Sequence, residues 1–436
     1  MIRRITYLLV AAFAALTSAA VAQSASVLSS GTWAQFSVEK HGVYKIDFDL
    51  LKKAGINPDN IDPRKLQLFA YPTGMLPQSN AVARPADLQE VAVFVSGEED
   101  GKFNAGDYLV FYGQGPDLIE YNTSKNIFRY QNNLYTDKNF YFLTVGQNGK
   151  RVAPATDGTA TDVVNEFLDF NYYETDSYNE LKSGREWFGE NFDTKSDITI
   201  RFTLEGITNN SEVTVVSSLM AQTYAESSYK LSWNNAQILD RKLQTVPETQ
   251  YGLKGRVATD TLRLVANNVN AVGVTNQDIK FSYAKAANTR SAAYINFVLL
   301  QVKRKAAWYA NPTMFTLPAR STDFTSVEFS SAPSGVSIWD VSDPFACQQK
   351  QLGSNNQFVA PTSSTRNFAA FTVGDLPVPA FEQNIANQNV RGYSTPDLLI
   401  VTHPDFRSEA QRLANHRQSI YQIDASVVTT EEIYRE

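Results

Sequence analysis

Short stretches of alternating apolar and polar residues recur along most of the chain from Trp33 onward. Apolar residues occupy every second position in I-T-I-R-F-T-L (198–204) and in I-K-F-S-Y (279–283). Because successive side chains of a β-strand point to opposite faces, this period is typical of strands with one buried face. Denser apolar runs, which suit strands buried on both faces, lie at 91–95, 108–112 and 141–145. Turn-forming groups such as P-T-G and Q-N-G-K separate the runs, so the pattern predicts β-sandwiches.

The chain is longer than one hydrophobic core usually serves, and its 436 residues predict several domains. A small, polar stretch at 153–161 suggests a boundary between an N-terminal β domain (23–155) and a second β-sandwich-like domain (156–390). Within the second domain, residues 312–379 are rich in Ser, Thr, Pro and Asn and are expected to be rich in loops. In the first domain, Asp47 is expected to cap a short helix that buries Leu50 and Leu51 and ends at Gly55.

The N-terminus has the layout of a secretory signal peptide over residues 1–22. Arg3 and Arg4 precede a nearly continuous apolar run, and Ala20-Val21-Ala22 supplies small residues before Gln23. A transmembrane anchor is the alternative, but it needs about twenty apolar residues and this run is shorter. We therefore expect export, with cleavage between Ala22 and Gln23.

The pattern changes near residue 391. The apolar run 397–402 reads as a strand, and Asp405 is expected to cap a helix over 406–417 in which Phe406, Ala410, Leu413 and Ala414 follow helical spacing. A second strand is expected over 421–428. Thr429 with Glu432 three residues later then predicts a capping box at the start of another helix.

Strand, helix and strand in this order predict a βαβ unit with two parallel strands. Two parallel strands cannot cover both faces of a sheet, whereas parallel sheets are normally covered on both. The expected fold class is therefore mainly β: two β-sandwich-like modules followed by the first βαβ unit of an α/β domain, which spans 391–436 and is expected to continue beyond Glu436.

Composition excludes several classes of function. Thirty-nine basic against 45 acidic residues give a net charge of −6, so no excess of positive charge is available to hold nucleic acid. The only cysteine, Cys347, cannot form an internal disulfide, and there are three histidines, His41, His403 and His416. No cofactor is implied.

The turn G-E-E-D-G-K-F-N-A-G-D-Y (97–108) is the candidate metal site. Asp100, Asn104 and Asp107 offer oxygen ligands around two glycines, and calcium prefers such flexible oxygen sets. The alternative is a tight polar turn between two strands.

The segment S-G-R-E-W-F-G-E (183–190) is the candidate ligand loop. Glu186 and Glu190 flank Trp187, next to Arg185, and paired carboxylates beside an aromatic ring can act on sugars or bind them. The alternative, which we prefer, is a loop whose aromatic residues pack onto the β core while Arg185 pairs with a glutamate.

A catalytic thiol needs a neighbouring histidine, and no sequence pattern places one beside Cys347. A structural, non-catalytic Cys347 is therefore expected. Serine-hydrolase, P-loop, zinc-protease and dinucleotide-binding motifs are absent from the sequence.

Several segments together resemble one family, the type IX secretion system sortases (the PorU family) of gingipain-like cysteine peptidases. They are G-V-Y-K-I (42–46), K-L-Q-L-F (65–69), P-A-D-L-Q-E-V (85–91), D-G-K-F-N-A-G-D-Y (100–108), S-G-R-E-W-F-G-E (183–190), N-Q-N-V-R-G-Y-S (387–394) and, most specifically, D-L-L-I-V-T-H-P-D-F (397–406). The last segment resembles the opening of the gingipain-type, caspase-like catalytic domain.

The resemblance implies a peripheral protein of the outer membrane surface that removes C-terminal signal domains from secreted cargo and attaches the cargo to anionic lipopolysaccharide. It also implies an outer-membrane partner of the PorV type. The family's His-Cys dyad matches no residue here, since His41-Gly42 lacks the context and Cys347 precedes the catalytic domain. No catalytic residue is therefore assigned, and the dyad is expected beyond Glu436.

Two functional hypotheses follow. In the first, the chain is the front half of a surface cysteine peptidase and serves as its scaffold and docking region. In the second, it is a stand-alone exported β-sandwich module that binds glycans or proteins.

Overall fold

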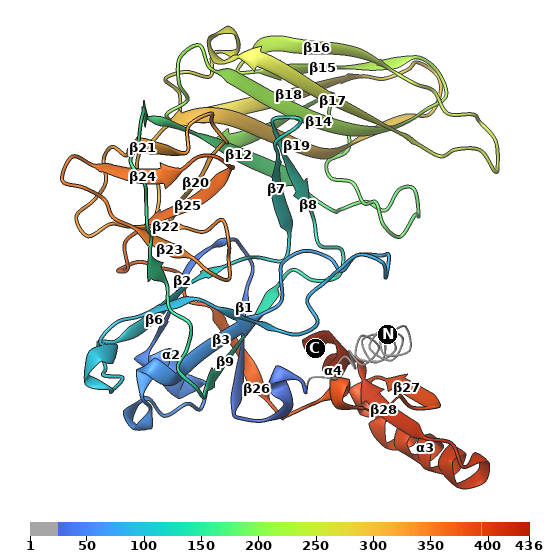
Figure 1. Cartoon of the computed structure of the whole chain (residues 1–436). Coiled ribbons are helices and arrows are strands. Elements are labelled where there is room, and N and C mark those ends of the chain that lie inside the picture. The colour runs from blue at the N-terminus through green and yellow to red at the C-terminus, as the bar shows by residue number, and fades with distance from the viewer. Residues whose placement is uncertain (1–24, 394) are drawn as a thin grey trace, which may run out of the picture.

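The structure is a computed structural model that describes residues 25–393 and 395–436. It is mainly β, with a small α/β unit at the C-terminal end, as the sequence predicts. In Figure 1 the sandwich sheets lie above an N-terminal β region, and the α/β unit lies at the lower right. The expected signal peptide and its cleavage site at Ala22 and Gln23 lie outside the described residues.

The N-terminal region packs a five-stranded sheet, in the order β26-β1-β9-β3-β4, against a three-stranded sheet, in the order β2-β6-β5. Their apolar residues, among them Phe36, Ile46 and Phe111, form one buried core. The strands are β1 (Trp33–Val38), β2 (Gly42–Asp47), β3 (Leu66–Ala70), β4 (Gln89–Val91), β5 (Val93–Val95), β6 (Tyr108–Gly113), β9 (Asn139–Val145) and β26 (Ala380–Ile385).

Helix α2 (Phe48–Lys53) forms as expected. The Asp47 side chain accepts a hydrogen bond from the Leu50 N–H, Leu50 and Leu51 are buried, and Gly55 follows with a positive φ of 77°. The apolar run 91–95, by contrast, is two strands rather than one. Ala92 leaves the ladder and donates its N–H to the Phe345 carbonyl oxygen, so β4 and β5 belong to different sheets.

Strand β26 returns to the N-terminal sheet from late in the chain. It pairs antiparallel with β1 from Trp33↔Ile385 to Ser37↔Ala380. Glu382 then accepts hydrogen bonds from Ser37 Oγ at 2.6 Å and from Lys138 Nζ at 2.8 Å. The stretch 380–385, which the division at residue 390 places in the second module, thus lies in the sheet of the first.

A nine-stranded sheet, in the order β10-β23-β22-β25-β20-β12-β19-β14-β17, runs through the upper part of the molecule. One end faces the four-stranded sheet β13-β18-β15-β16 across a core that contains Trp233 and Phe281. The strands of this sandwich are β12 (Glu166–Glu174), β13 (Asp197–Thr203), β14 (Glu212–Thr223), β15 (Ser227–Trp233), β16 (Ala236–Leu243), β17 (Arg256–Val265), β18 (Asn276–Ala284) and β19 (Ser291–Lys305).

The other end of the same sheet faces the three-stranded sheet β11-β21-β24. Five phenylalanines, Phe167, Phe315, Phe329, Phe358 and Phe368, fill the space between them. The strands here are β10 (Ala153–Pro154), β11 (Val163–Val164), β20 (Thr313–Leu317), β21 (Phe324–Glu328), β22 (Ser337–Asp340), β23 (Gln348–Lys350), β24 (Gln357–Pro361) and β25 (Arg366–Phe371). Most residues of 312–379 lie outside these short strands, as the expectation of a loop-rich segment has it. Within the strands, polar Ser and Thr alternate with buried residues.

A hairpin made of β7 (Leu118–Asn122) and β8 (Ile127–Gln131) rises from the N-terminal region and lies against β12 and β19 (Figure 1). A second contact joins the same two parts of the molecule. Val43, Val110 and Tyr112 of the N-terminal region pack against Trp339 and Phe371 at the end of the large sheet.

The C-terminal unit consists of β27 (Leu398–Thr402), α3 (Arg407–Tyr421), β28 (Ala425–Thr429) and α4 (Thr430–Arg435). The two strands are parallel, as predicted, in register from Leu398↔Ala425 to Thr402↔Thr429. The capping box is also present, since the Thr429 side chain and the Glu432 carboxylate each accept the other residue's backbone N–H.

The limits of the helix in this unit differ from the expected ones. Asp405 is not the cap, because a 3-10 turn (Pro404–Phe406) precedes α3 and Phe406 stands at its start. The helix extends to Tyr421 and ends at Gln422, which adopts a left-handed conformation. Ala410 and Ala414 are buried as expected, whereas Phe406 and Leu413 are exposed. No helix among the described residues is long and apolar enough to span a membrane.

The phenylalanine cluster provides a test of the fold. Phe315 is 3% exposed and its ring lies 5.0–5.6 Å from those of Phe167, Phe368 and Phe329. Phe315→Ala should lower the free energy of unfolding by about 3–5 kcal/mol through lost burial and an unfilled cavity, measured by urea denaturation. The control Phe406→Ala removes a ring that is 63% exposed and should change it by less than about 0.5 kcal/mol. Equal effects of the two substitutions would contradict the packing described.

Candidate functional site

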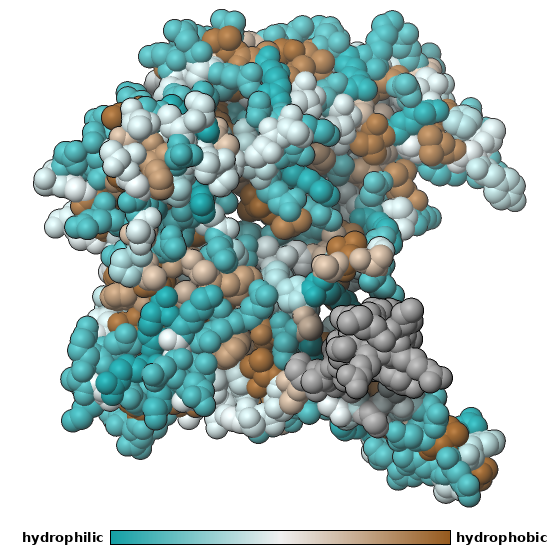
Figure 2. Space-filling model, viewed as in Figure 1, coloured by the Kyte–Doolittle hydropathy of each residue, from teal (hydrophilic) through white to brown (hydrophobic). Residues whose placement is uncertain are grey.

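The C-terminal α/β unit is covered by its helix on one face of the two strands. Ala410 and Ala414 of α3 pack on Ala425 and Val427, with Leu398 and Ile400 partly buried beside them. On the opposite face Leu399 is 49% and Val401 52% exposed, while Val428 is buried. Figure 2 shows apolar patches on this unit among hydrophilic surface. On the face opposite α3, the apolar side chains of β27 are therefore left uncovered by the described residues, whereas Val428 of β28 is covered.

The carboxyl ends of β27 and β28 form the edge at which α/β folds place ligands. His403 lies there, exposed, and its Nδ1 accepts the Asp405 N–H at 3.3 Å at the start of the 3-10 turn. Thr429 at the end of β28 is engaged in the capping box. These groups close local turns, and neither is a nucleophile paired with a base.

A polar cluster fastens this unit to the N-terminal region. Gln388 donates from Nε2 to the Glu432 carbonyl oxygen at 2.8 Å. The Arg391 guanidinium lies 3.2 Å from the Glu436 carboxylate and 3.9 Å from the Asp87 carboxylate. Asp87 also accepts the Val27 N–H. The α/β unit is thus held beside the sheet that contains β1 and β26.

Cys347 is not placed for catalysis. It is 1% exposed within an apolar cluster with Trp339 and Phe371, and burial raises the pKa of its thiol well above the ordinary value. Its Sγ lies 3.7 Å from the Asp343 carbonyl oxygen. His41 belongs to a different contact, in which its Nε2 is 2.9 Å from the Asp117 carbonyl oxygen and burial lowers its pKa.

The candidate calcium turn brings its three residues together. Asp107 accepts the Asn104 N–H at 2.6 Å, and Asn104 Nδ2 donates to Asp100 at 3.1 Å. Asp100 also accepts the Lys102 N–H, and these hydrogen bonds lower the pKa of its carboxyl. The oxygens thus already satisfy donors of the turn itself. No cluster of three or more His, Cys, Asp or Glu suited to a metal occurs in the described part of the chain. Calcium binding by Asp100, Asn104 and Asp107 stays a prediction.

The candidate ligand loop is anchored by Phe188, which is fully buried against Met220 and Tyr294. Arg185 and Glu186 are exposed, and their N–H groups both donate to Ser183 Oγ. Trp187 remains 42% exposed.

The two glutamates of this loop have different environments. Glu190 accepts a hydrogen bond from the Tyr173 hydroxyl, and burial together with this carboxylate raises the pKa of Tyr173 to about 12. Glu186, in contrast, is exposed at the surface. A role of Arg185, Glu186, Trp187 and Glu190 in ligand binding stays a prediction.

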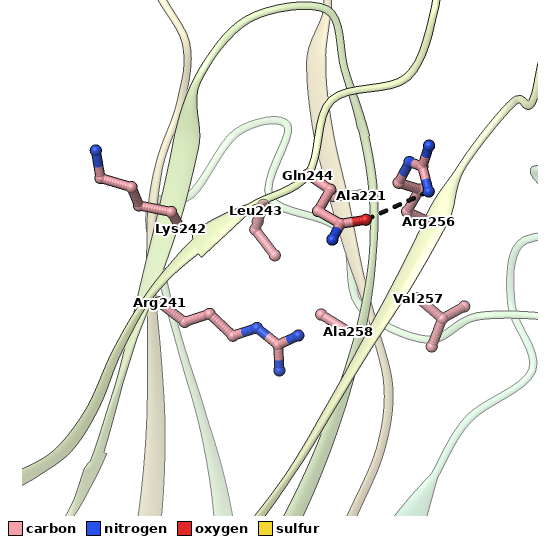
Figure 3. Close-up of a pocket in the computed structure, with 8 residues that line it drawn as sticks. All are labelled: Ala221, Arg241, Lys242, Leu243, Gln244, Arg256, Val257 and Ala258. Carbon is pink, nitrogen blue, oxygen red and sulfur yellow. Dashed lines mark hydrogen bonds between the residues drawn. The ribbon is translucent and has the colours of Figure 1, made fainter.

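A small pocket of about 120 Å³ between β16 and β17 was not indicated by the sequence (Figure 3). Its lining includes Arg241 and Lys242 of β16 and Arg256 of β17, the next strand along the chain. Arg241 is bound to Asp260, Lys242 lies 2.8 Å from Glu226, and Arg256 Nη1 donates to Gln244 Oε1 at 3.3 Å. Because these cations already have partners within the chain, the pocket assigns no ligand.

The comparison with family models matches residues 392–436 to Peptidase family C25. The fold is thus mainly β and is followed by a small α/β unit, and it is this unit that matches the family model. Among solved structures, the dimeric latent PorU from Porphyromonas gingivalis aligns with a TM-score of 0.79 and 23% identity over 94% of this chain. The chain spans 38% of the length of that protein.

Other solved structures are much less similar. The delta-endotoxin Cry8Ea1 from Bacillus thuringiensis has a TM-score of 0.21 and 9% identity over 54% of this chain and 41% of its own. The cycloalternan-forming enzyme from Listeria monocytogenes has a TM-score of 0.18 and 11% identity over 42% of this chain and 15% of its own. At these scores neither carries an argument about fold. The comparison with curated proteins found no match.

The burial of Cys347 predicts that it is chemically inert in the folded protein. A thiol-alkylating reagent reacts with the thiolate, which burial disfavours, so labelling at neutral pH should be at least about a hundredfold slower than in urea. Mass spectrometry over time measures both rates. Native labelling as fast as that of the unfolded chain would show that the thiol is accessible.

Proposed function

We propose that the chain is the N-terminal part of a type IX secretion sortase-like cysteine peptidase. The observation that carries the proposal is the α/β unit at the end of the chain, which matches Peptidase family C25 over 392–436. Its sheet, with one face half uncovered at Leu399 and Val401, suits a larger α/β domain. The similarity of the β platform to that of PorU supports the same assignment.

Acyl transfer by such an enzyme requires a thiolate beside an imidazole. Cys347 is buried and none of the three histidines is bonded to it, so we assign the dyad to polypeptide after Glu436. The division into a signal peptide (1–22), an N-terminal β domain (23–155), a second β domain (156–390) and the start of a catalytic domain (391–436) belongs to the same proposal. The exception is 380–385, which adds a strand to the first domain.

In this proposal the β domains act as scaffold and docking region at the outer membrane surface. The substrates are secreted proteins with C-terminal signal domains, the partner is an outer-membrane component of the PorV type, and the acceptor is anionic lipopolysaccharide. The cluster around Arg391 supports the scaffold role, because it fixes the α/β unit to the N-terminal sheet through Asp87 and Glu436. The alternative is a stand-alone exported module that binds glycans or proteins.

Disruption of the gene in its own organism tests the proposal. Secreted proteins with C-terminal signal domains should then keep these domains, and mass spectrometry of their C-termini measures the result. The complete gene should restore removal. Normal processing in the disrupted strain would overturn the proposal and leave the binding module as the alternative.

A matched variant shows whether Cys347 is the nucleophile or only a structural residue. Complementation with the complete gene carrying Cys347→Ala should restore processing to within about twofold, because the substitution only shortens a buried side chain. Loss of processing with unchanged amounts of folded protein would instead identify Cys347 as the nucleophile.

A further inference from the structure

The β7–β8 hairpin joins the N-terminal region to the sandwich through stacked aromatic rings. Tyr130 lies parallel to Tyr172 of β12, with 3.9 Å between ring centroids and 13° between planes. Phe128 stacks on Phe170 at 4.4 Å, and Tyr172 stacks in turn on Phe297 of β19 at 5.6 Å. The hairpin lies against the nine-stranded sheet (Figure 1), and its side chains cover apolar rings on the outer face of that sheet.

A buried amide fixes the position of the hairpin on the sheet. Gln301 of β19 is 5% exposed, and its Oε1 accepts the Phe128 N–H at 2.9 Å. Its Nε2 donates to the Asn126 carbonyl oxygen at 3.0 Å. One side chain thereby satisfies a donor and an acceptor of the hairpin, which specifies a single docked arrangement.

Acidic side chains lie at the end of the ring stack. Asp117, just before β7, accepts hydrogen bonds from the Tyr130 hydroxyl and the Asn133 N–H. Glu174, at the end of β12, accepts from the Tyr172 hydroxyl and from Asn132 Nδ2, which follows β8. Both stacked tyrosines therefore donate to carboxylates, one on each side of the interface.

Like charges meet at this point. Burial, and then the carboxylates of Asp176 and Asp117, raise the pKa of Glu174 to about 7, against a weaker opposing effect of the Tyr172 hydrogen bond. Burial also raises the pKa of Asp176. The remaining titratable neighbours are the two tyrosines, whose pKa values are raised, and His41, whose pKa is lowered and which contacts the Asp117 carbonyl oxygen.

We infer that this hairpin is a pH-dependent clamp between the N-terminal region and the sandwich, closed while Glu174 carries a proton and loosened when Glu174 is ionised beside Asp117 and Asp176. In the docked state Glu174 binds its proton more tightly than an exposed glutamate, whose pKa is 4.5. The docked hairpin therefore holds more protons between pH 4.5 and about 7, and docking weakens as pH rises through this window.

Loosening the hairpin would expose the rings of Phe170, Tyr172 and Phe297 and relax one of the contacts between the two parts of the molecule. The other contact, around Trp339 and Tyr112, is apolar, and burial raises the pKa values of the Cys347 thiol and the Tyr112 hydroxyl within it. The clamp would thus change the freedom of the sandwich relative to the N-terminal region without separating them.

Amide hydrogen exchange of Phe128, whose N–H reports docking through Gln301, tests the inference. After correction for intrinsic rates, protection should be roughly tenfold lower at about pH 8 than at about pH 5.5 in the full chain. Glu174→Gln, which mimics the protonated side chain, should keep protection high at both pH values. The same pH dependence in E174Q, or none in the unsubstituted chain, would overturn the clamp.

Asp176→Asn provides a second variant at an exposed position, where folding should be unaffected. Removing this charge relieves repulsion on Glu174, so the midpoint of the change in protection should move to lower pH. Asp162→Asn is the control, because the Asp162 carboxylate contacts Arg320 and Thr325 and has no hydrogen bond to the hairpin, so the midpoint should stay where it is. A midpoint unmoved by D176N would show that Glu174 is not the titrating group.

Discussion

The pairing of β1 with β26 is the contact on which the arrangement of the molecule depends. It joins residues more than 340 positions apart and closes the N-terminal sheet with a strand that follows both sandwich cores. Because β26 ends at Ile385, the linker that follows begins beside the N-terminal sheet. Gln388 and Arg391 then bind the end of α4, so the α/β unit has its place beside this sheet. The platform and the C-terminal unit are thereby one assembly rather than modules in series.

Local patterns in the sequence predicted the parts of the fold that local chemistry determines. The Asp47 cap and the Thr429–Glu432 capping box depend on residues three positions apart, and the parallel strands β27 and β28 belong to one βαβ unit of consecutive elements. Long-range pairing could not be read in this way. A nine-stranded sheet shared by two cores requires β12 to contact both β19 and β20, and β26 to leave its neighbours in sequence. Such pairing depends on complementary faces across the whole chain.

The candidate site shows the same division. The sequence indicated an α/β unit at the end of the chain and predicted a structural, non-catalytic Cys347. Burial of the Cys347 thiol raises its pKa and explains why this residue is unreactive. It did not indicate Glu174, because the raised pKa of this carboxyl arises from burial under a hairpin and from Asp117 and Asp176. Asp117 is 57 positions away in the chain, and only the folded hairpin brings it close. Electrostatic sites of this kind are properties of tertiary contacts.

The central proposal is that the α/β unit belongs to a larger sheet, because Leu399 and Val401 are exposed on a face that the described residues leave half uncovered. Amide hydrogen exchange of β27 relative to β9 tests it most directly. Strand β9 is paired on both sides, with β1 and β3, whereas β27 pairs only with β28 among the described residues. The account predicts that β27 exchanges much faster than β9 in the chain of 436 residues. Equal protection of the two strands would contradict it.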